Sequence, residues 1–424
     1  MDIHVVQPGD TLYQLARQYG VSMDQLLRDN QLPNPAQLVV GQTIVVRYPE
    51  TVDQVKEGDT LWSIARMHQI SVRQLLRNNP GLEGRDRLFP GQTLVVSFRH
   101  TPELPLSVNG YAYPSIDRAL LEGTLPDLSR LTPFTYRFEE DSLVPLRDES
   151  LVRAALQMGT APIFHLSNLD SQERFSPELA QELLEDREDQ EELIEEIIET
   201  VGEKGYRGVD VDFEFVPGQD AERYAQFLDR LRRALSPRGL SLTAAVAPKT
   251  SDSQPGRAQE GHDYVKIAQA VDYAVLMTYD WGWTGGPPMA VAPLPQVRQV
   301  VDYALTRFRP EQLYLGVPLY GYNWTLPWRD GSRAVSLGCQ QAVRLAWDQR
   351  AAIRYDETAQ APWLRYFQDG VEHEVWFEDA RSIQAKLNLA LEYGLHGVSY
   401  WNVDRPFPQN WTVLNATAQV REEM

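Results

Sequence analysis

An internal repeat in the first hundred residues constrains the fold of this part of the chain more than any other feature. Residues 5–30 align with residues 54–79 at a constant offset of 49. Within this stretch Gly9-Asp10-Thr11-Leu12 matches Gly58-Asp59-Thr60-Leu61, and further along Gly41-Gln42-Thr43 matches Gly91-Gln92-Thr93 at an offset of 50. Such self-similarity indicates that one structural unit has been duplicated.

The residue pattern of each unit predicts the order strand, helix, helix, strand. Apolar side chains recur at helical spacing over residues 12–19, and a second short helix is expected over residues 23–30. Gly41 and Gln42 form a turn before an alternating strand at residues 43–46. Asp10 and Asp59 stand where a helix N-cap is expected.

Each unit resembles a LysM module, a small βααβ fold that binds glycans containing N-acetylglucosamine, such as peptidoglycan and chitin. We assign the two modules to residues 1–48 and 52–98. The resemblance implies that the loops 32–38 and 82–88 line the sugar grooves together with Gly9, Asp10, Thr11, Gly58, Asp59 and Thr60. Turn and cap chemistry alone would explain any one of these residues equally well. Two weak sites on one chain would give avidity on a polymer.

The remainder of the chain, residues 101–424, alternates short apolar runs with helical patterns. Strands that alternate with helices predict a parallel sheet, and eight such units predict a closed (β/α)8 barrel. The stretch between strands seven and eight, residues 322–378, has strand-like runs of its own and is interpreted as an inserted α+β lobe. The eight predicted strands are Ser107–Ala112, Leu131–Arg137, Pro162–Ser167, Gly208–Phe215, Ser241–Ala247, Tyr273–Tyr279, Gln312–Tyr320 and Gly397–Trp401.

The fourth predicted strand carries the chemical signal of this sequence. Because strand side chains alternate between faces, Asp210, Asp212 and Glu214 share one face while the apolar residues between them share the other. The apolar face belongs against the surrounding helices, so the three acids are expected to point into the barrel. Burying carboxylates without partners costs several kcal/mol each, and neighbouring acids resist joint ionisation. At least one of them should therefore stay protonated, ready to act as a general acid.

The acidic strand could instead be a solvated edge strand or part of a metal site. A solvated edge strand would need its apolar face to find a core elsewhere. Three acids could hold magnesium or calcium, but no further His or Asp cluster in the sequence supports a metal site. We therefore expect no metal.

The run from Arg207 to Glu214 resembles the Asp-Gly-x-Asp-x-Asp-x-Glu signature of glycoside hydrolase family 18, the chitinase-like barrels. It departs only at the first position, where Arg207 replaces an acid at the strand entrance. Other segments match in family order: Asn109-Gly110-Tyr111 at strand one, Met277-Thr278-Tyr279-Asp280 at strand six, and Tyr400-Trp401-Asn402 at strand eight.

The resemblance implies a retaining, substrate-assisted mechanism without a cofactor. Glu214 would be the acid and base, Asp212 would orient the substrate's 2-acetamido group, and Asp210 would support Asp212. Tyr279 would donate a hydrogen bond to the acetamido oxygen. The implied substrate contacts are Trp401 under the reacting sugar, together with Asp280, Met277, Tyr111 and Asn109, although Tyr111 and Met277 could equally be core residues.

Charge and composition limit the partners. The net charge is −19, and because residues 1–100 hold ten basic and ten acidic residues, all of it lies in residues 101–424. Nucleic acid is therefore not an expected partner. The only cysteine is Cys339, and neither a secretory signal nor a transmembrane run is visible, so we expect a protein made in the cytoplasm that does not insert into a membrane. We expect a monomer.

The combination of two LysM modules with a family 18 barrel resembles bacterial spore cortex-lytic N-acetylglucosaminidases. The expected substrate is then peptidoglycan, cut after N-acetylglucosamine in spore cortex fragments during germination, by a protein located in the spore coat or cortex. One alternative is a chitinase or chitooligosaccharide hydrolase. The other is a non-catalytic glycan-binding spore-coat protein, against which the intact Glu214 argues.

Overall fold

The two halves of the repeat fold alike in the computed structural model, which describes the whole chain except residues 33–35, 37, 83–87, 140–141 and 424. In each half an antiparallel pair of strands flanks two helices, as the pattern predicts. The predicted loops 32–38 and 82–88 lie largely outside the described residues. The first unit contains β1 (Asp2–Val5), α1 (Leu12–Tyr19), α2 (Met23–Asn30) and β2 (Thr43–Val46), and the second contains β3 (Pro49–Gln54), α3 (Leu61–Met67), α4 (Val72–Asn78) and β4 (Thr93–Phe98).

The first helix of each unit is capped by threonine, so the prediction that Asp10 and Asp59 are the caps is wrong. Thr11 accepts a hydrogen bond from the backbone N–H of Gln14, and Thr60 accepts one from that of Ser63. Asp10 and Asp59 lie one residue earlier and accept from the backbone of the preceding turn. A threonine side chain one residue closer to the helix reaches the free N–H groups of its first turn.

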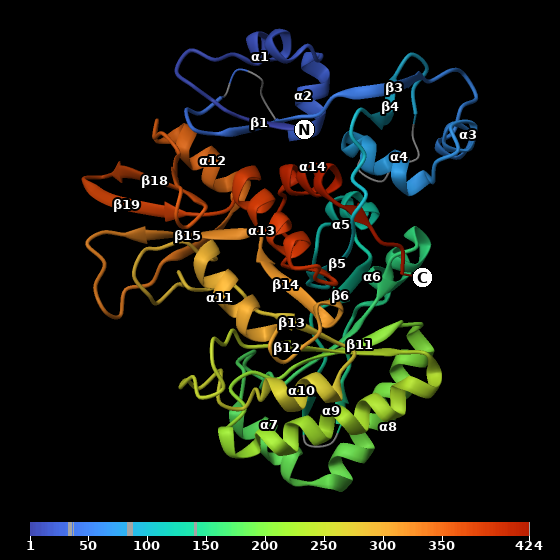
Figure 1. The fold of residues 1–424 in the computed structure, drawn as a ribbon, viewed down its shortest axis with the longest axis vertical. Coiled ribbons are helices and arrows are strands. Elements are labelled where there is room, and N and C mark those ends of the chain that lie inside the picture. Colours follow the sequence, from blue (N-terminus) through green and yellow to red (C-terminus); the bar gives the residue numbers. More distant parts are fainter. Residues whose placement is uncertain (33–35, 37, 83–87, 140–141, 424) are drawn as a thin grey trace.

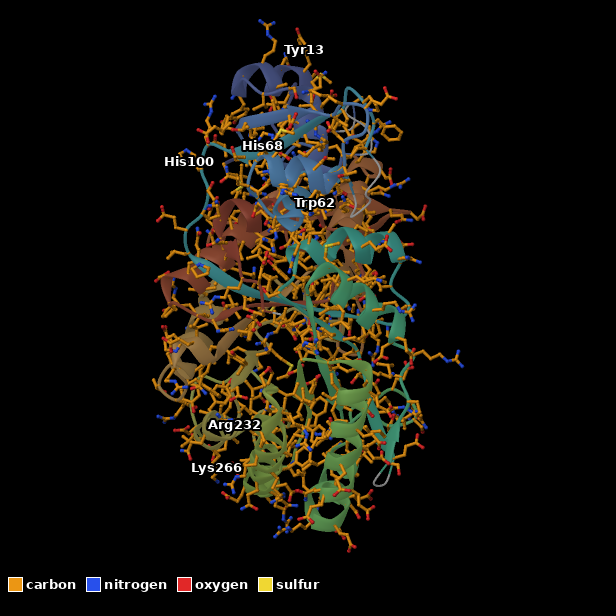
Figure 2. The ribbon with its side chains drawn as sticks, turned by 90° about the vertical axis from the view of Figure 1, so that its right-hand side faces the viewer. Tyr13, Trp62, His68, His100, Arg232 and Lys266 are labelled. Carbon is orange, nitrogen blue, oxygen red and sulfur yellow. The ribbon has the colours of Figure 1, made fainter. Side chains whose placement is uncertain are left out.

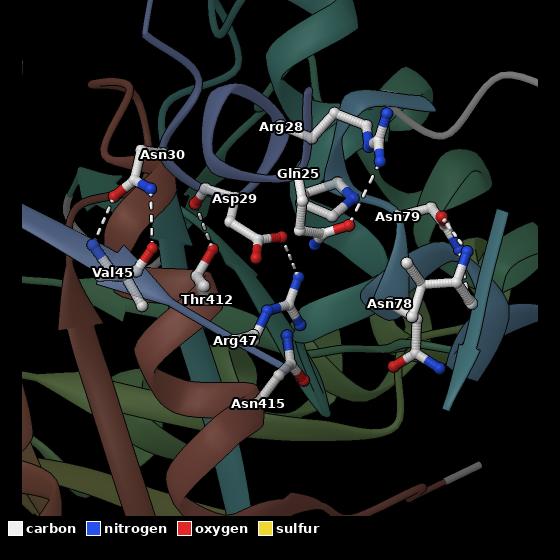
Figure 3. A network of polar contacts seen from close by, with 12 residues as sticks. Gln25, Arg28, Asp29, Asn30, Val45, Arg47, Asn78, Asn79, Thr412 and Asn415 are labelled. Atoms are coloured by element: carbon white, nitrogen blue, oxygen red, sulfur yellow. Dashed lines mark hydrogen bonds and ion pairs between the residues drawn. The ribbon is translucent and has the colours of Figure 1, made fainter. Parts of the chain in front are cut away.

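A repeated asparagine joins the second helix of each unit to its last strand. Asn30 donates to the carbonyl oxygen of Val45 at 2.8 Å and accepts from its N–H at 2.7 Å (Figure 3). Asn79, 49 residues later, makes the same pair of bonds with Val95 at 2.7 and 2.8 Å. Both side chains are buried, so these bonds satisfy backbone groups that water cannot reach.

The remainder of the chain forms a parallel barrel, as predicted. Its third strand is interrupted at Ile163, and the barrel is closed by pairing of the second strand with the first half of the third and by a bridge between Tyr136 and Leu166. Beginning with the first strand, the barrel strands are β5 (Pro105–Ala112), β6 (Arg130–Pro133), β9 (Ala161–Pro162) with β10 (Phe164–Ser167), β11 (Gly208–Asp212), β12 (Ser241–Val246), β13 (Tyr273–Leu276), β14 (Leu313–Pro318) and β20 (Gly397–Trp401).

Helices cover the outside of the barrel (Figure 1). They bury the outward faces of the strands: Val209, Val211 and Phe213 are fully buried, and the Phe213 ring stacks at 5.7 Å on those of Tyr224 and Phe227. Burial of each such side chain contributes about 1.5–3 kcal/mol. The helices are α5 (Arg118–Thr124), α6 (Glu149–Met158), α7 (Pro177–Glu185), α8 (Arg187–Lys204), α9 (Ala221–Leu235), α10 (Tyr264–Ala270), α11 (Leu294–Ala304), α13 (Ala380–Glu392) and α14 (Pro408–Thr417). No helix among the described residues is long and apolar enough to cross a membrane.

Smaller elements complete the barrel. The hairpin β7 (Arg137–Glu139) and β8 (Ser142–Val144) follows the second strand, and β21 (Gln419–Val420) pairs with β5 near the C-terminus. Glu423 forms an ion pair with Arg130 at the entrance of β6, and the Arg130 guanidinium lies 4.5 Å from the ring of Tyr273. The C-terminal residues therefore close the end of the barrel opposite the carboxyl ends of its strands.

An α+β lobe is inserted between the seventh and eighth barrel strands, as predicted. It contains an antiparallel sheet in the order β16-β15-β19-β18-β17 and one helix. Its elements are β15 (Tyr320–Thr325), β16 (Val335–Gly338), α12 (Cys339–Asp348), β17 (Arg354–Asp356), β18 (Ala361–Gln368) and β19 (Val371–Trp376).

The two N-terminal units pack directly on the barrel rather than hanging from linkers. Figure 1 shows them side by side over α12, α13, α14 and α5. In the first unit Asp29 pairs with Arg47 at 2.6 Å, both being buried, and its carbonyl oxygen accepts from Thr412 of α14 at 2.7 Å (Figure 3). In the second unit Arg73 donates to the carbonyl oxygens of Leu128 and Gly159, each at 2.5 Å.

The repeat also places one aromatic side chain of each unit in solvent. Tyr13 and Trp62 occupy equivalent positions and are 58% and 61% exposed (Figure 2). The guanidinium groups of Arg17 and Arg66 lie 5.9 and 5.0 Å from the respective ring centres. The first helix of each unit therefore presents an aromatic and a cationic side chain to solvent.

Candidate active site

Two of the three predicted acids lie inside the barrel on β11. Asp210 and Asp212 are 2% and 6% exposed, and in the neighbouring strand β10 they align with His165 and Ser167. The apolar side chains between them face the helices, as the alternation predicts. The acids are therefore held by a rigid strand rather than by a loop.

Glu214 follows the end of the strand, which is shorter than predicted. Its N–H donates to the side-chain oxygen of Asn168 at 2.9 Å, and its carbonyl oxygen accepts from the amide of the same side chain at 2.9 Å. The next residue, Phe215, has a φ of +58° and turns the chain away. Glu214 is half-buried, so it lies partly in contact with solvent beyond the carboxyl end of the strand.

Burial raises the pKa of all three carboxyl groups, and neighbouring acids raise those of Asp212 and Glu214 further. Burial raises the pKa of Asp210 to about 6, although a hydrogen bond from Tyr111 and the charge of Arg130 act in the opposite direction. Burial, together with the charges of Glu214 and Asp210, raises the pKa of Asp212 well above its ordinary value. Burial and the charge of Asp280 raise the pKa of Glu214 to about 7. The group therefore retains protons near neutral pH, as a general acid requires.

His165 is a residue of this site that the sequence reasoning missed. It is fully buried, and its Nε2 lies 3.6 Å from Oδ2 of Asp210 and 3.8 Å from Oδ2 of Asp212. Its other ring nitrogen lies 2.5 Å from the hydroxyl of Thr135. Burial lowers its pKa to about 3, so the imidazole is neutral. Alternation in the run Pro162–Ser167 puts His165 on the inward face, and this was the signal in the sequence.

The first strand supplies Tyr111 and Asn109, which have different surroundings. The Tyr111 hydroxyl donates to Oδ2 of Asp210 at 2.8 Å, so this buried ring contacts the acids directly. The Asn109 side chain donates to Ser399 at 3.0 Å and accepts from Thr132 at 2.8 Å. Asn109 thus bonds to neighbouring strands deep in the barrel, and its predicted contact with substrate stays a prediction.

Strand six ends at Leu276, so the predicted residues Met277, Tyr279 and Asp280 lie on the loop after it. Asp280 has a φ of +62° and accepts hydrogen bonds from Tyr320 at 2.8 Å and from Tyr322 at 3.0 Å. The inserted lobe thereby fixes this loop. Burial and the nearby acids, Asp212 first among them, raise the pKa of Tyr279, which remains a hydroxyl donor. Met277 is half-buried.

Trp401 ends strand eight and lies within an aromatic wall. Its ring centre is 4.8 Å from that of Phe134, 5.4 Å from that of Tyr111 and 6.2 Å from that of Tyr113, at edge-to-face angles. Trp401 is half-buried, so part of it remains open to solvent. Such a ring offers an apolar surface at a fixed angle beside the acids.

Known proteins resemble the chain in both of its parts. Residues 170–405 match Glycosyl hydrolases family 18, and residues 4–47 and 54–97 each match the LysM domain. The chain belongs to glycoside hydrolase family 18.

Full-length relatives share the whole architecture of this family 18 hydrolase. This chain is 42% identical over 427 residues to the cortical fragment-lytic enzyme of Bacillus subtilis (strain 168), and the alignment covers 98% of this chain and 97% of that protein. The crystal structure of the spore cortex-lytic enzyme SleL of Bacillus cereus has a TM-score of 0.84 at 38% identity, over 99% and 98% of the two chains. A chitinase from Chromobacterium violaceum shares the fold, with a TM-score of 0.68 at 24% identity over 73% of this chain and 98% of that one.

The departure from the family 18 signature at Arg207 leaves the acids undisturbed. Arg207 is exposed at the entrance of β11, where its side chain donates to the carbonyl oxygen of Gly205 at 2.9 Å. The next position needs glycine, because a β-carbon at Gly208 would lie 2.6 Å from the hydroxyl of Ser241. The glycine of the signature therefore allows close strand packing, while its first residue lies outside the barrel.

In the LysM modules the predicted contact side chains are used for local structure. Asp10 accepts from the N–H of Gln7 at 2.7 Å and lies 2.9 Å from His4, while Thr11 caps its helix. Gly9 and Gly58 have φ values of +92° and +88° and are exposed, with no atom within 4 Å of an added β-carbon. Sugar contact by these residues stays a prediction. The exposed backbone at Gly9 and Gly58 is the surface that a sugar would contact.

The described residues contain no group of three or more His, Cys, Asp or Glu side chains arranged to hold a metal ion. The acids of β11 instead face tyrosine and histidine. What the arrangement offers chemically is proton transfer beside an aromatic wall.

Proposed function

We propose that the protein hydrolyses the glycosidic bond after N-acetylglucosamine in peptidoglycan, acting on spore cortex fragments during germination. The observation that carries the proposal is Glu214, a half-buried acid with a pKa raised to about 7, placed directly after two buried aspartates. The similarity of the chain along its whole length to cortical fragment-lytic enzymes supports the substrate. The LysM modules support an insoluble glycan rather than a small metabolite.

In the proposed reaction the substrate supplies its own nucleophile. Glu214 gives its proton to the leaving glycosidic oxygen as the bond from that oxygen to C1 breaks. At the same time the 2-acetamido oxygen of the sugar forms a bond to C1, which gives a cyclic oxazolinium ion. Water then attacks C1 as the bond from C1 to the acetamido oxygen breaks, which restores the 2-acetamido group. Glu214 takes the proton of that water, and the configuration at C1 is retained.

Asp212 and Asp210 act on the acetamido group in this proposal. Repulsion between two buried acids makes them share one proton. When that proton lies on Asp210, Asp212 is a carboxylate that accepts a hydrogen bond from the substrate's N–H and balances the positive charge of the oxazolinium. Tyr111 holds Asp210 beside it through a hydrogen bond, and the neutral His165 ring lies against both acids. Tyr279 donates to the acetamido oxygen, and Trp401 packs under the reacting sugar.

In this proposal the protein acts as a monomer and is associated with the spore. The names of its relatives support that location, because they are called cortical fragment-lytic enzyme and spore cortex-lytic enzyme. The modules packed on the barrel support a single chain that carries both the glycan-binding and the hydrolytic parts.

The test is release of reducing sugar from purified cortex fragments, with chitin oligomers alongside and products identified by mass spectrometry. Glu214→Gln should abolish release, a loss of at least about 10² in rate, while the variant still cosediments with cortex. Glu182→Gln, an exposed acid on α7, is the matched control and should retain full activity. Undiminished hydrolysis by Glu214→Gln would overturn the assignment. Cleavage of chitin oligomers alone would indicate a chitinase, and binding without cleavage by the unsubstituted protein would indicate a coat protein.

A further inference from the structure

A large cavity lies away from the acids, between the first LysM module and the inserted lobe. Its volume is about 580 Å³, which is within the usual range of sites for small molecules. The module contributes residues on either side of its second loop, the lobe contributes one face of α12, and the start of α14 forms the floor. Residues from each wall are Gln31, Val39, Gln340, Trp347, Phe407 and Gln409.

The walls of this cavity are fixed to one another. The N–H of Ile353 in the lobe donates to the carbonyl oxygen of Val40 at 2.9 Å, and a β-carbon at Gly41 would lie 1.8 Å from the carbonyl oxygen of Ile353. Gln409 donates to Asn30 at 2.8 Å and to the carbonyl oxygen of Thr43 at 2.7 Å. The equivalent turn of the second module, at Gly91, has no atom within 4 Å of an added β-carbon. Only the first module is therefore joined to the lobe through this turn.

Helix α12 presents a stripe of unused polar groups to the cavity. Gln340, Val343, Arg344 and Trp347 follow the i, i+3, i+4, i+7 spacing that defines one face of a helix. In the described part of the chain, the side chains of Gln340, Arg344 and Trp347 have neither a hydrogen bond nor an ion pair. Trp347 is 40% exposed. The stripe combines an aromatic ring with amide and guanidinium donors.

A buried ion pair lies behind one wall of the cavity. Glu378 lines the cavity and is 1% exposed, and its Oε2 pairs with Lys386 at 2.7 Å. Its other oxygen, Oε1, has no hydrogen-bond partner among the described residues. This oxygen is shielded from solvent, so the buried ion pair fixes the wall of the cavity and leaves the contacts with a ligand to α12.

Two smaller cavities share walls with this one. A cavity of about 520 Å³ shares Val39 and Trp347, and one of about 230 Å³ shares Gln31 and Phe407 and extends to Asp117 on the loop that follows β5. The three together form an interrupted groove along the boundary between the first module and the barrel. An extended chain of several units suits such a groove better than a compact ligand does.

We propose that this groove is an additional binding site for the glycan strand, which takes N-acetylated aminosugar units remote from the bond that is cut. The Trp347 ring would pack against the apolar face of a sugar, while Gln340 and Arg344 would bond to its hydroxyl and acetamido oxygens. The site rests on the proposed function for the identity of its ligand. None of the catalytic acids and none of Gly9, Asp10 and Thr11 lines this cavity. Among the described residues, it shares with the predicted sugar groove of the module only the start of loop 32–38, through Leu32.

The test measures binding apart from hydrolysis. In the full chain carrying Glu214→Gln, we expect Trp347→Ala to weaken binding of long cortex fragments about tenfold, equivalent to about 1.4 kcal/mol. Phe367→Ala is the matched control, because this aromatic of the same lobe is 68% exposed and lies outside the cavity. In the catalytically intact chain, Phe367→Ala should leave hydrolysis of cortex fragments unchanged.

Hydrogen exchange provides a readout that does not depend on substitution. Adding a tetramer of β-1,4-linked N-acetylglucosamine should slow exchange in α12, and Trp347→Ala should remove that protection. Equal binding by Trp347→Ala and Phe367→Ala, or no protection of α12, would overturn the groove site. Failure of the proposed function would instead appear as an absence of hydrolysis by the unsubstituted chain, whatever the binding results.

Discussion

Nε2 of His165 lies 3.6 Å from Oδ2 of Asp210, yet the two residues do not form an ion pair. The same burial that lowers the pKa of His165 to about 3 raises that of Asp210 to about 6, so the imidazole is neutral whenever the carboxyl group is charged. Nδ1 is hydrogen-bonded to the hydroxyl of Thr135, and Nε2 of the neutral ring faces both aspartates. His165 therefore keeps water away from the acids without neutralising them.

The first prediction concerns this ring. His165→Ser should admit water beside Asp210 and Asp212 and lower the pKa of the pair, because burial is the largest cause of its elevation. If catalysis needs the pair to hold one proton, the acid limb of kcat/KM against pH reports its first ionisation. That limb should move to lower pH, with kcat reduced about tenfold or more.

Tyr111→Phe is the matched variant for the same limb. It removes the hydrogen bond that lowers the pKa of Asp210, so the limb should move to higher pH. A purely structural role for both residues would reduce activity without displacing the limb in opposite directions. Displacement of both profiles in one direction would contradict the account.

The second prediction concerns the alkaline limb. Glu214 works as an acid only while protonated, so activity should fall as pH rises through its pKa of about 7. Asp280→Asn removes a negative charge that raises this pKa, and the alkaline limb should therefore move to lower pH. The asparagine oxygen can still accept from Tyr320 and Tyr322, which limits structural change.

The control for this prediction is Asp330→Asn, which removes an exposed carboxyl group of the lobe. Both profiles should be measured on the same soluble substrate. If Asp280→Asn left the alkaline limb where Asp330→Asn leaves it, Glu214 would not be the group that titrates there.

Periodic features of the sequence were sufficient to predict the architecture. The repeat predicted two βααβ units, and strand alternation placed Asp210 and Asp212 inside the barrel. The predicted strand ends were less accurate, because Glu214 and Tyr279 lie just beyond the last ladder bonds, where the chain turns to expose them. A single inward-facing histidine such as His165 leaves only a weak signal, since its role depends on a neighbouring strand 45 residues later.

The packing of the modules on the barrel could not be predicted, because it joins residues far apart in the sequence. Position 24 of the first unit is an exposed aspartate, whereas its equivalent, Arg73, is buried against the barrel. The difference is visible in the alignment but has no meaning until both surfaces are known. The same holds for Gly41 and Gly91, which are equivalent in the repeat and differ only in whether Ile353 lies against them.

The last prediction concerns this packing. Arg73→Ala should lower the free energy of unfolding by about 2–3 kcal/mol, because the carbonyl oxygens of Leu128 and Gly159 lose their buried donor. Urea titration followed by tryptophan fluorescence measures the change, and Arg66→Ala on the exposed face of α3 is the control, with a change below about 0.5 kcal/mol. A similarly small change for Arg73→Ala would mean that the second module is only loosely attached. Avidity would then come from a tether, whereas the buried contacts favour modules that hold the glycan in a fixed direction relative to Glu214.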